Sequence, residues 1–177
     1  DLFLDPADLP AFRAGEWLHV CSIALSAEPS RSAAFQAMAA IRQAGGFVSF
    51  DPNIRADLWH DELDLRACLE RALACADVVK LSVEELAFLT GNAQVDEGLA
   101  ALMRGCRARL VVVTQGQEGV TPWQKGALRH YPATTVECVD ATGAGDAFVA
   151  GLLSGLAREG DADLPAVIAI AQRCGAL

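Results

Sequence analysis

Short apolar runs alternate with amphipathic segments along the first two thirds of the chain. The run WLHVCSIAL, residues 17–25, is short and bounded by a Glu-Pro-Ser break, which predicts a buried strand. The next segment has apolar residues at helical spacing from Ser30, and it predicts a helix that ends at Gly45–Gly46, where a left-handed cap is easiest. A strand over residues 47–51 and an acidic, proline-containing loop follow.

The same alternation continues to residue 114. Helices are predicted over 62–75, from Ser82 to Gly91 and over 96–105, with strands at 77–81 and 109–114. Strands that read as continuous apolar runs between helices are typical of right-handed βαβ crossovers in a parallel sheet covered on both faces.

The remaining residues depart from that alternation. The pattern predicts a hairpin of 119–123 and 127–131, a last strand near 134–138, a helix over 144–158 and a final helix from Leu164 to the end of the chain. The expected fold is therefore α/β: a Rossmann-like, mostly parallel sheet with helices on both faces, in a single domain over residues 1–177.

Composition and charge narrow the class of protein. The chain has 14 Lys and Arg against 23 Asp and Glu, a formal net charge of −9, and no basic cluster, so no nucleic-acid or anionic membrane partner is expected. Its apolar runs fall far below the ~20 residues of a membrane span, and the first segment does not read as a secretory signal. Six scattered cysteines without zinc-ligand spacing are expected to be small buried residues in a reducing cytoplasm.

A glycine turn at the start of the helix predicted over 144–158 is the first candidate for chemistry. Gly143 and Gly145 flank Ala144, and small residues there let a phosphate approach free main-chain N–H groups at the positive end of a helix. A tight turn without a ligand is the alternative interpretation. The segment is neither a dinucleotide fingerprint, since Phe148 takes the place of its last glycine, nor a Walker A loop.

Asp146 stands within the first turn of the same helix. One interpretation is simply a favourable acidic residue at the positive helix end. Beside a bound phosphate, however, an ionised carboxylate would oppose anion binding unless it had a role of its own. Accepting the proton of an attacking hydroxyl group is such a role.

Residues 140–148, D-x-T-G-A-G-D-x-F, resemble the C-terminal signature of the ribokinase-like carbohydrate kinases, the PfkB family. Three further motifs stand in that family's order: FDPNIR at 50–55, KLSVEEL at 80–86 with Thr-Gly at 90–91, and VVVTQGQEG at 111–119. Together they extend over nearly the whole chain, and among family members the chain is most similar to the bacterial fructokinases.

The resemblance implies roles around the glycine turn. Asp146 would be the catalytic base for the hydroxyl group of the sugar, and the main-chain N–H groups at Gly143, Ala144 and Gly145 would form the phosphate-binding anion hole, which the N–H of Asp146 completes. Asp140 and Thr142 match positions that help bind a monovalent cation, with a simple turn aspartate as the alternative.

The resemblance also implies a nucleotide-binding segment. Thr114, Gly116 and Gly119 match the family segment that passes along the nucleotide, and an ordinary strand end and turn is the alternative interpretation. Ser82 and Glu85 align with an Asn-x-x-Glu element that orders water and magnesium. Here serine replaces asparagine, and Ser-x-x-Glu is equally a helix capping box.

Three polar residues follow the strand predicted over 47–51. Asp51 and Asn53 are expected in a ligand cleft at the strand end, where ligands of open α/β sheets bind. Arg55 could pair either with phosphate or with Asp51, and the sequence does not choose between them.

The function that the resemblance implies is an ATP-dependent sugar kinase that transfers the γ-phosphoryl group to a primary hydroxyl of fructose, with ATP, Mg²⁺ and K⁺ as cofactors. The alternatives are a kinase for aminoimidazole riboside or 2-keto-3-deoxygluconate, or a catalytically silent nucleotide-binding protein. The family's lid, its N-terminal sugar contacts and its extreme C-terminal segment are not visible in the sequence. The chain is therefore expected to be a fragment that is inactive alone, from a full-length protein that forms a homodimer.

Overall fold

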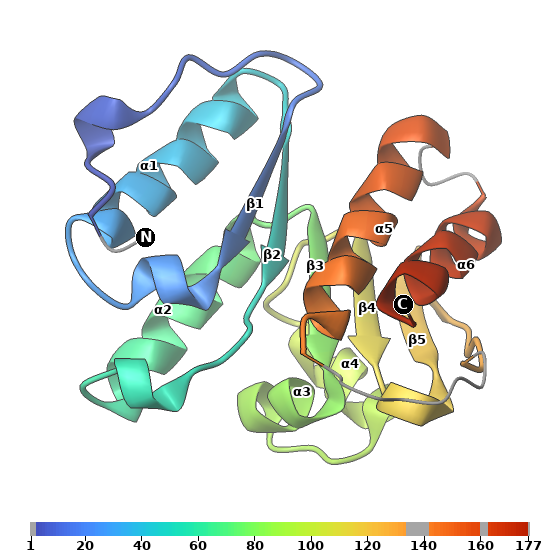
Figure 1. Cartoon of the computed structure of the whole chain (residues 1–177). Helices are drawn as coiled ribbons and strands as arrows, with labels where there is room; N and C mark the ends of the chain where they lie inside the picture. Colours follow the sequence, from blue (N-terminus) through green and yellow to red (C-terminus); the bar gives the residue numbers. More distant parts are fainter. Residues whose placement is uncertain (1–2, 134–141, 160–162, 177) are drawn as a thin grey trace. The chain divides into compact units, whose positions relative to one another are not determined.

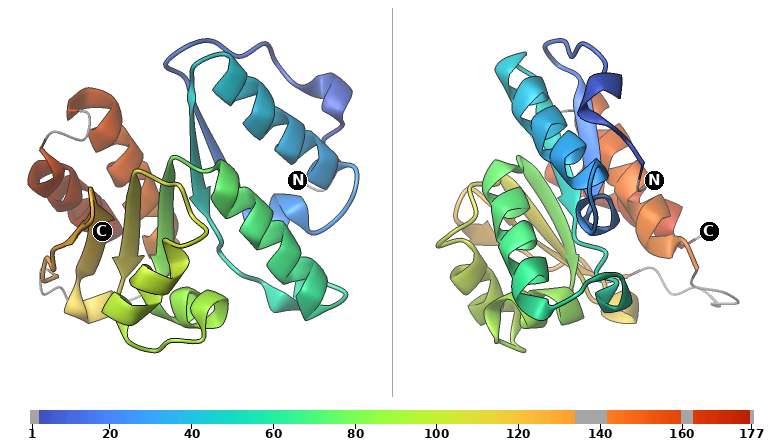
Figure 2. Two further views of the ribbon diagram at one scale, coloured as in Figure 1. Left: turned by 180° about the vertical axis from the view of Figure 1, so that it is seen from behind. Right: turned by 90° about the vertical axis from the view of Figure 1, so that its left-hand side faces the viewer.

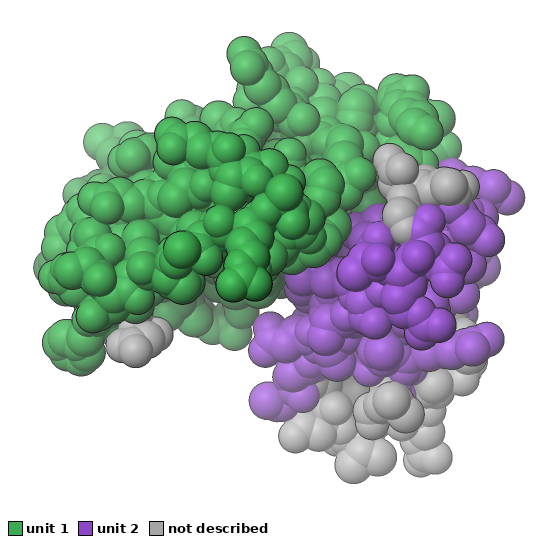
Figure 3. Space-filling view, turned by 90° about the horizontal axis from the view of Figure 1, so that it is seen from above, with its two compact units in different colours: residues 1–114, 122–128 green, residues 115–121, 129–177 purple. Residues whose placement is uncertain are grey.

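The computed structural model describes residues 3–133, 142–159 and 163–176. The chain divides into two compact units (Figure 3): unit 1 consists of residues 1–114 and 122–128, and unit 2 of residues 115–121 and 129–177. The single domain expected over 1–177 stays a prediction. None of the helices in the described residues combines the length and the apolar character that a bilayer crossing requires.

Unit 1 is built on parallel strands (Figure 1). β1 (Trp17–Cys21), β2 (Phe47–Asp51), β3 (Val78–Ser82) and β4 (Leu110–Thr114) lie in this order, each parallel to its neighbour. β5 (Val120–Gln124) follows β4 in the sheet and forms an antiparallel hairpin with the short β6 (Ala127–Leu128). The expected α/β fold with a mostly parallel sheet is thereby confirmed.

Four helices connect these strands: α1 (Ser30–Gln43), α2 (Glu62–Cys75), α3 (Val83–Thr90) and α4 (Val95–Leu102). Helix α1 ends as its glycines predict, because Gly45 has a left-handed φ of 83° and the Gly46 N–H donates to the Ile41 carbonyl. The single-turn 3₁₀ helices are η1 (Pro6–Asp8), η2 (Ser22–Leu25), η3 (Ala56–Leu58) and η4 (Gly116–Glu118).

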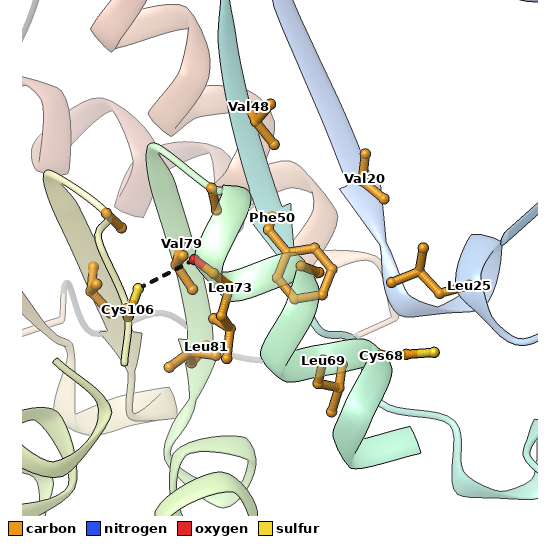
Figure 4. Packing of buried hydrophobic residues seen from close by; sticks show 14 of the residues in the cluster. Val20, Leu25, Val48, Phe50, Cys68, Leu69, Leu73, Val79, Leu81 and Cys106 are labelled. Carbon is orange, nitrogen blue, oxygen red and sulfur yellow. Dashed lines mark hydrogen bonds between the residues drawn. The ribbon is translucent and has the colours of Figure 1, made fainter. Parts of the chain in front are cut away.

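The core of unit 1 lies against one face of the parallel strands. Alternate strand residues point to the same face, so Val48 and Phe50 of β2 join Val79 and Leu81 of β3 in one buried cluster (Figure 4). Helices α1 and α2 pack on that face (Figures 1 and 2). The intervening residues of the strands, such as Asp51, therefore point to the opposite face.

Three predicted elements end elsewhere in the structure. The second hairpin strand, expected over 127–131, is a strand only over Ala127–Leu128, and Tyr131 beyond it forms an isolated bridge with Val120. The strand expected over 17–25 ends at Cys21, where its partner β2 also ends before Pro52; the Ser22 N–H donates to the Pro52 carbonyl, and the chain turns into η2. The helix expected over 96–105 runs from Val95 to Leu102, because residues 103–105 form a turn closed by the Cys106 N–H on the Leu102 carbonyl.

The cysteines agree only in part with the expected burial. Cys68 and Cys106 are buried, and the Cys106 thiol contacts the Leu73 carbonyl oxygen at 3.7 Å (Figure 4). Those at the ends of elements are half-buried: Cys21, Cys75 and Cys174. Cys138 lies outside the described residues.

Unit 2 contains a helical hairpin of α5 (Ala144–Glu159) and α6 (Leu164–Gly175). The two helices approach closely at glycines: a Cβ added to Gly151 would lie 2.9 Å from the Ala171 Cα. The Gln172 side chain donates to the carbonyls of Tyr131 and Pro132, which ties α6 to that segment. The strand expected near 134–138 lies outside the described residues.

Candidate functional site

The start of α5 presents main-chain N–H groups that have no acceptor within the helix. Gly143 has a left-handed φ of 79° immediately before Ala144, the first residue of the helix. The first bond along the helix runs from the Ala147 N–H to the Gly143 carbonyl at 2.8 Å. The N–H groups of Ala144, Gly145 and Asp146 precede that bond and have no acceptor within the helix, so they can bind an anion.

The Asp146 carboxylate lies in the first turn of α5, and its side chain is exposed. A carboxylate in that place is accessible to a small substrate and can accept a proton from it. Thr142 is also exposed, whereas Asp140 lies outside the described residues, so the predicted monovalent-cation site stays a prediction.

The turn over residues 115–119 has a structural explanation of its own. Gly116 and Gly119 adopt positive φ values of 58° and 111°, and the Gln115 N–H donates to the Gly119 carbonyl. A Cβ on Gly119 would collide with the carbonyl oxygen of Tyr131. Thr114, in unit 1, donates its hydroxyl to the Leu81 carbonyl at 3.2 Å. These contacts match the ordinary strand end and turn, and nucleotide binding by these residues stays a prediction.

Ser82 and Glu85 form the capping box of α3. The Glu85 N–H donates to the Ser82 hydroxyl at 3.2 Å, and the Ser82 N–H donates back to Glu85 Oε2 at 2.8 Å. The other carboxylate oxygen, Oε1, accepts the Ile54 N–H at 2.9 Å. Each of these oxygens can accept a second hydrogen bond, so a contact with a magnesium-bound water fits the pair. That role stays a prediction.

No group of three or more His, Cys, Asp and Glu side chains that could hold a metal ion occurs in the part of the chain that the structure describes. Mg²⁺ in phosphoryl-transfer enzymes is typically held by one or two carboxylates together with substrate phosphates and waters, so a dedicated cage is not needed. The carboxylate of Glu85 is a group of this chemical type.

Asp51 forms a buried ion pair that the sequence analysis missed. Its Oδ2 lies 3.0 Å from Lys80 Nζ, and its Oδ1 accepts the Asn53 N–H at 3.2 Å. Burial raises the pKa of the Asp51 carboxyl above its ordinary value, and the charge of Lys80 opposes that rise. A lysine inside the apolar strand VVKLS was the available signal, because a buried lysine is almost always paired.

The ion pair concerns one of the two partners considered for Arg55. Asp51 pairs with Lys80, and Arg55 has no carboxylate partner among the described residues; its guanidinium is exposed. The pairing of Arg55 with phosphate stays a prediction. Asn53 is half-buried with a φ of 38°, a left-handed conformation that asparagine tolerates better than most residues.

Within unit 1 the structure brings Asp51, Asn53, Ser82 and Glu85 together through the hydrogen bonds of the 52–55 loop. Within unit 2 it places the glycine turn and Asp146 at one helix end.

The sequence pattern of the pfkB family carbohydrate kinases matches residues 2–177. The chain belongs to this family. The resemblance that the four motifs indicated is therefore confirmed.

Individual family members agree closely with this chain. It is 60% identical to a fructokinase of Klebsiella pneumoniae over its whole length, and it spans 59% of the length of that relative. Its structure superposes with a TM-score of 0.95 on a double mutant of fructokinase from Vibrio cholerae O395 with fructose, ADP and potassium ion bound, at 45% identity, covering 100% of this chain and 58% of that one.

A second enzyme of the family is also similar. The aminoimidazole riboside kinase of Salmonella enterica, solved with aminoimidazole riboside and an ATP analog, gives a TM-score of 0.93 at 35% identity, covering 99% of this chain and 60% of that one. Both solved structures confirm the ribokinase-like fold expected from the sequence.

Proposed function

We propose that the protein is an ATP-dependent sugar kinase that transfers the γ-phosphoryl group of ATP to a primary hydroxyl of fructose. The observation that carries this proposal is the start of α5, where three main-chain N–H groups precede the helical hydrogen bonds beside the exposed carboxylate of Asp146. The higher identity to the fructokinases than to the aminoimidazole riboside kinase favours fructose over the riboside.

In the proposed reaction the carboxylate of Asp146 accepts the proton of the sugar hydroxyl as its oxygen bonds to the γ-phosphorus. The bond from that phosphorus to the bridging oxygen breaks, and its electron pair leaves with ADP. The N–H groups of Ala144, Gly145 and Asp146 hold the negative charge on the transferring phosphoryl oxygens.

The cofactors of this reaction are part of the proposal. Mg²⁺, when bound with ATP, neutralises phosphate charge, and Glu85 with Ser82 would hold its waters. Asp140 and Thr142 would help to hold K⁺, and Thr114, Gly116 and Gly119 would lie along the nucleotide. Arg55, with no carboxylate partner among the described residues, is available for phosphate. A cytoplasmic location and a homodimer of the full-length protein stay predictions.

A panel of acceptors tests the proposal. The full-length protein is incubated with ATP, Mg²⁺ and K⁺ together with fructose, aminoimidazole riboside or 2-keto-3-deoxygluconate, and ADP release is followed by a coupled assay. We expect the highest kcat/KM with fructose. A higher value with another acceptor would correct the substrate but keep the reaction class. ATP binding without turnover on any of the three would overturn the proposed activity in favour of a silent nucleotide-binding protein.

A further inference from the structure

A lysine and an aspartate are buried together beside the loop that follows β2. Lys80 Nζ lies 3.0 Å from Asp51 Oδ2, and the two side chains are 11% and 2% exposed. They come from neighbouring strands, one residue beyond the paired Phe50 and Val79. Since strand residues alternate between faces, the ion pair lies on the face opposite the apolar cluster that contains Phe50 and Val79.

Stability alone does not account for this pair. Removing two charges from water costs free energy that their attraction repays only in good geometry, and apolar residues of similar volume often stabilise a core at least as well. Sites flanking the pair are already filled by apolar residues, including Val78, Val79 and Leu81. The contacts of Asp51 beyond Lys80 supply a second role.

The second oxygen of Asp51 shapes the loop. Oδ1 accepts the Asn53 N–H at 3.2 Å, which closes a side-chain turn two residues long. The Asn53 carbonyl in turn accepts the Ser22 hydroxyl at 3.4 Å, and the next N–H, that of Ile54, donates to Glu85. One carboxylate therefore joins the ion pair at one oxygen and the start of the 52–55 loop at the other.

We propose that Lys80 is a positioning residue: by holding Oδ2 of Asp51 it fixes the carboxylate that closes the turn at Asn53, and so sets the backbone that carries Asn53 and Arg55. This inference rests on the proposed function, which makes Arg55 available for phosphate in the phosphoryl-transfer reaction. Lys80 acts through Asp51 and not by contact with the substrate.

The test uses Lys80→Met in the full-length protein with two readouts. The first is amide hydrogen exchange at Asn53 and Ile54 without substrate, and the second is kcat for fructose phosphorylation. We expect exchange at these two amides to accelerate and kcat to fall ~10–100-fold, as for the loss of a residue that orients a binding group.

Two further variants separate positioning from stability. Val79→Ala lies next to Lys80 in β3 and removes buried apolar volume on the opposite face. It should lower the unfolding midpoint while leaving exchange at Asn53 and Ile54, and kcat, near the wild-type values. The double variant Asp51→Asn/Lys80→Met contains no unpaired buried charge, so its unfolding midpoint should recover while its kcat stays low and its loop exchange stays fast.

The double variant also decides the question if Lys80→Met alone does not fold. Wild-type exchange and wild-type kcat in the double variant would overturn the proposal. In that case Lys80 and Asp51 would only compensate each other's buried charge, without any effect on the 52–55 loop. The same result in Lys80→Met would overturn it as well. The exchange measurement needs no substrate, so failure of the proposed kinase activity leaves it decisive: faster exchange supports the positioning role even in a protein that phosphorylates no sugar.

Discussion

The β3–α3 turn of unit 1 and the start of α5 in unit 2 both begin a helix, and both were predicted to bind phosphate-associated groups. In the first, the carboxylate of Glu85 already accepts N–H groups from Ser82 and Ile54, so the chain supplies partners for its own polar atoms. In the second, the N–H groups of Ala144 to Asp146 precede the helical hydrogen bonds.

This difference separates residues that hold the fold from residues that are available to a ligand. Substitution in the β3–α3 turn should cost stability first, because it leaves a main-chain donor without its acceptor. Substitution at the start of α5 should cost activity with little change in stability, because the donors and the carboxylate there have no internal partner to lose within the helix.

The largest effect is expected at Asp146. Asp146→Asn removes the base but keeps the size of the side chain, so kcat for fructose should fall ~10²–10⁴-fold while ADP affinity and the unfolding midpoint stay close to wild type. Asp163→Asn is the matched control, since Asp163 is also an exposed acid at a helix start, where it caps α6. Near-normal turnover of Asp146→Asn would remove the assignment of the base.

Local signals predicted the start of α5 well, because glycines and a first-turn acid act within a few residues. Contacts between residues far apart in the sequence were harder to predict. The Lys80–Asp51 pair joins residues 29 apart, and the bond from Ile54 to Glu85 joins residues 31 apart. The Ser82–Glu85 capping box was predicted as an alternative from four residues, yet the second partner of Glu85 depends on how β2 and β3 are paired.

The same distinction explains the error at residues 17–25. The apolar run continues to Leu25, so its composition favours a longer strand. The strand ends at Cys21 because the partner strand ends at Asp51, which a single segment does not reveal. Asp140 and the strand near 134–138 lie outside the described residues.

Substitutions at two glycines test whether the 115–119 turn holds the fold, binds a ligand, or does both. Gly119→Ala combines an unfavourable φ of 111° with a collision against the Tyr131 carbonyl, and it should lower the free energy of unfolding by roughly 2–6 kcal/mol. Gly116→Ala, with φ of 58° and open space around the added Cβ, should cost about 1–2 kcal/mol. Chemical denaturation of both variants measures the difference.

Which of the two variants loses more unfolding free energy decides whether the contact with Tyr131 explains Gly119. If Gly116→Ala proves the more damaging to stability, the close approach of Tyr131 does not explain Gly119. If ATP affinity drops in Gly116→Ala well beyond its loss of stability, the turn also contacts the nucleotide, as the family resemblance implies.

A smaller effect is expected at Glu85. Glu85→Gln keeps one carbonyl oxygen, so one of the two N–H groups, of Ser82 or Ile54, loses its acceptor at a cost of about 1–3 kcal/mol in unfolding free energy. Glu84→Gln is the matched control in the same first turn, since Glu84 is exposed. Unchanged stability in Glu85→Gln would contradict the structural role, whereas a weakened Mg²⁺ dependence of kcat would add the metal role to it.

The smallest effect, and the sharpest separation of the two roles, is expected at Ser82. Ser82→Ala removes the hydroxyl that caps α3 and should cost about 1 kcal/mol of unfolding free energy, whereas Ser82→Asn retains a good capping group and should be nearly neutral. Thermal or chemical unfolding of the two variants checks this order.

The activities of the same two variants then decide between capping alone and capping with a contact to magnesium-bound water. If Ser82 only caps the helix, kcat and the Mg²⁺ concentration for half-maximal activity should stay at wild-type values in both variants under conditions where each is fully folded. If the side chain also orders water, Ser82→Ala should need more Mg²⁺ than Ser82→Asn, because the asparagine amide can still hydrogen-bond a water while alanine cannot. Equal Mg²⁺ requirements would show that Ser82 only holds the fold of unit 1, through the capping bonds that it makes with Glu85.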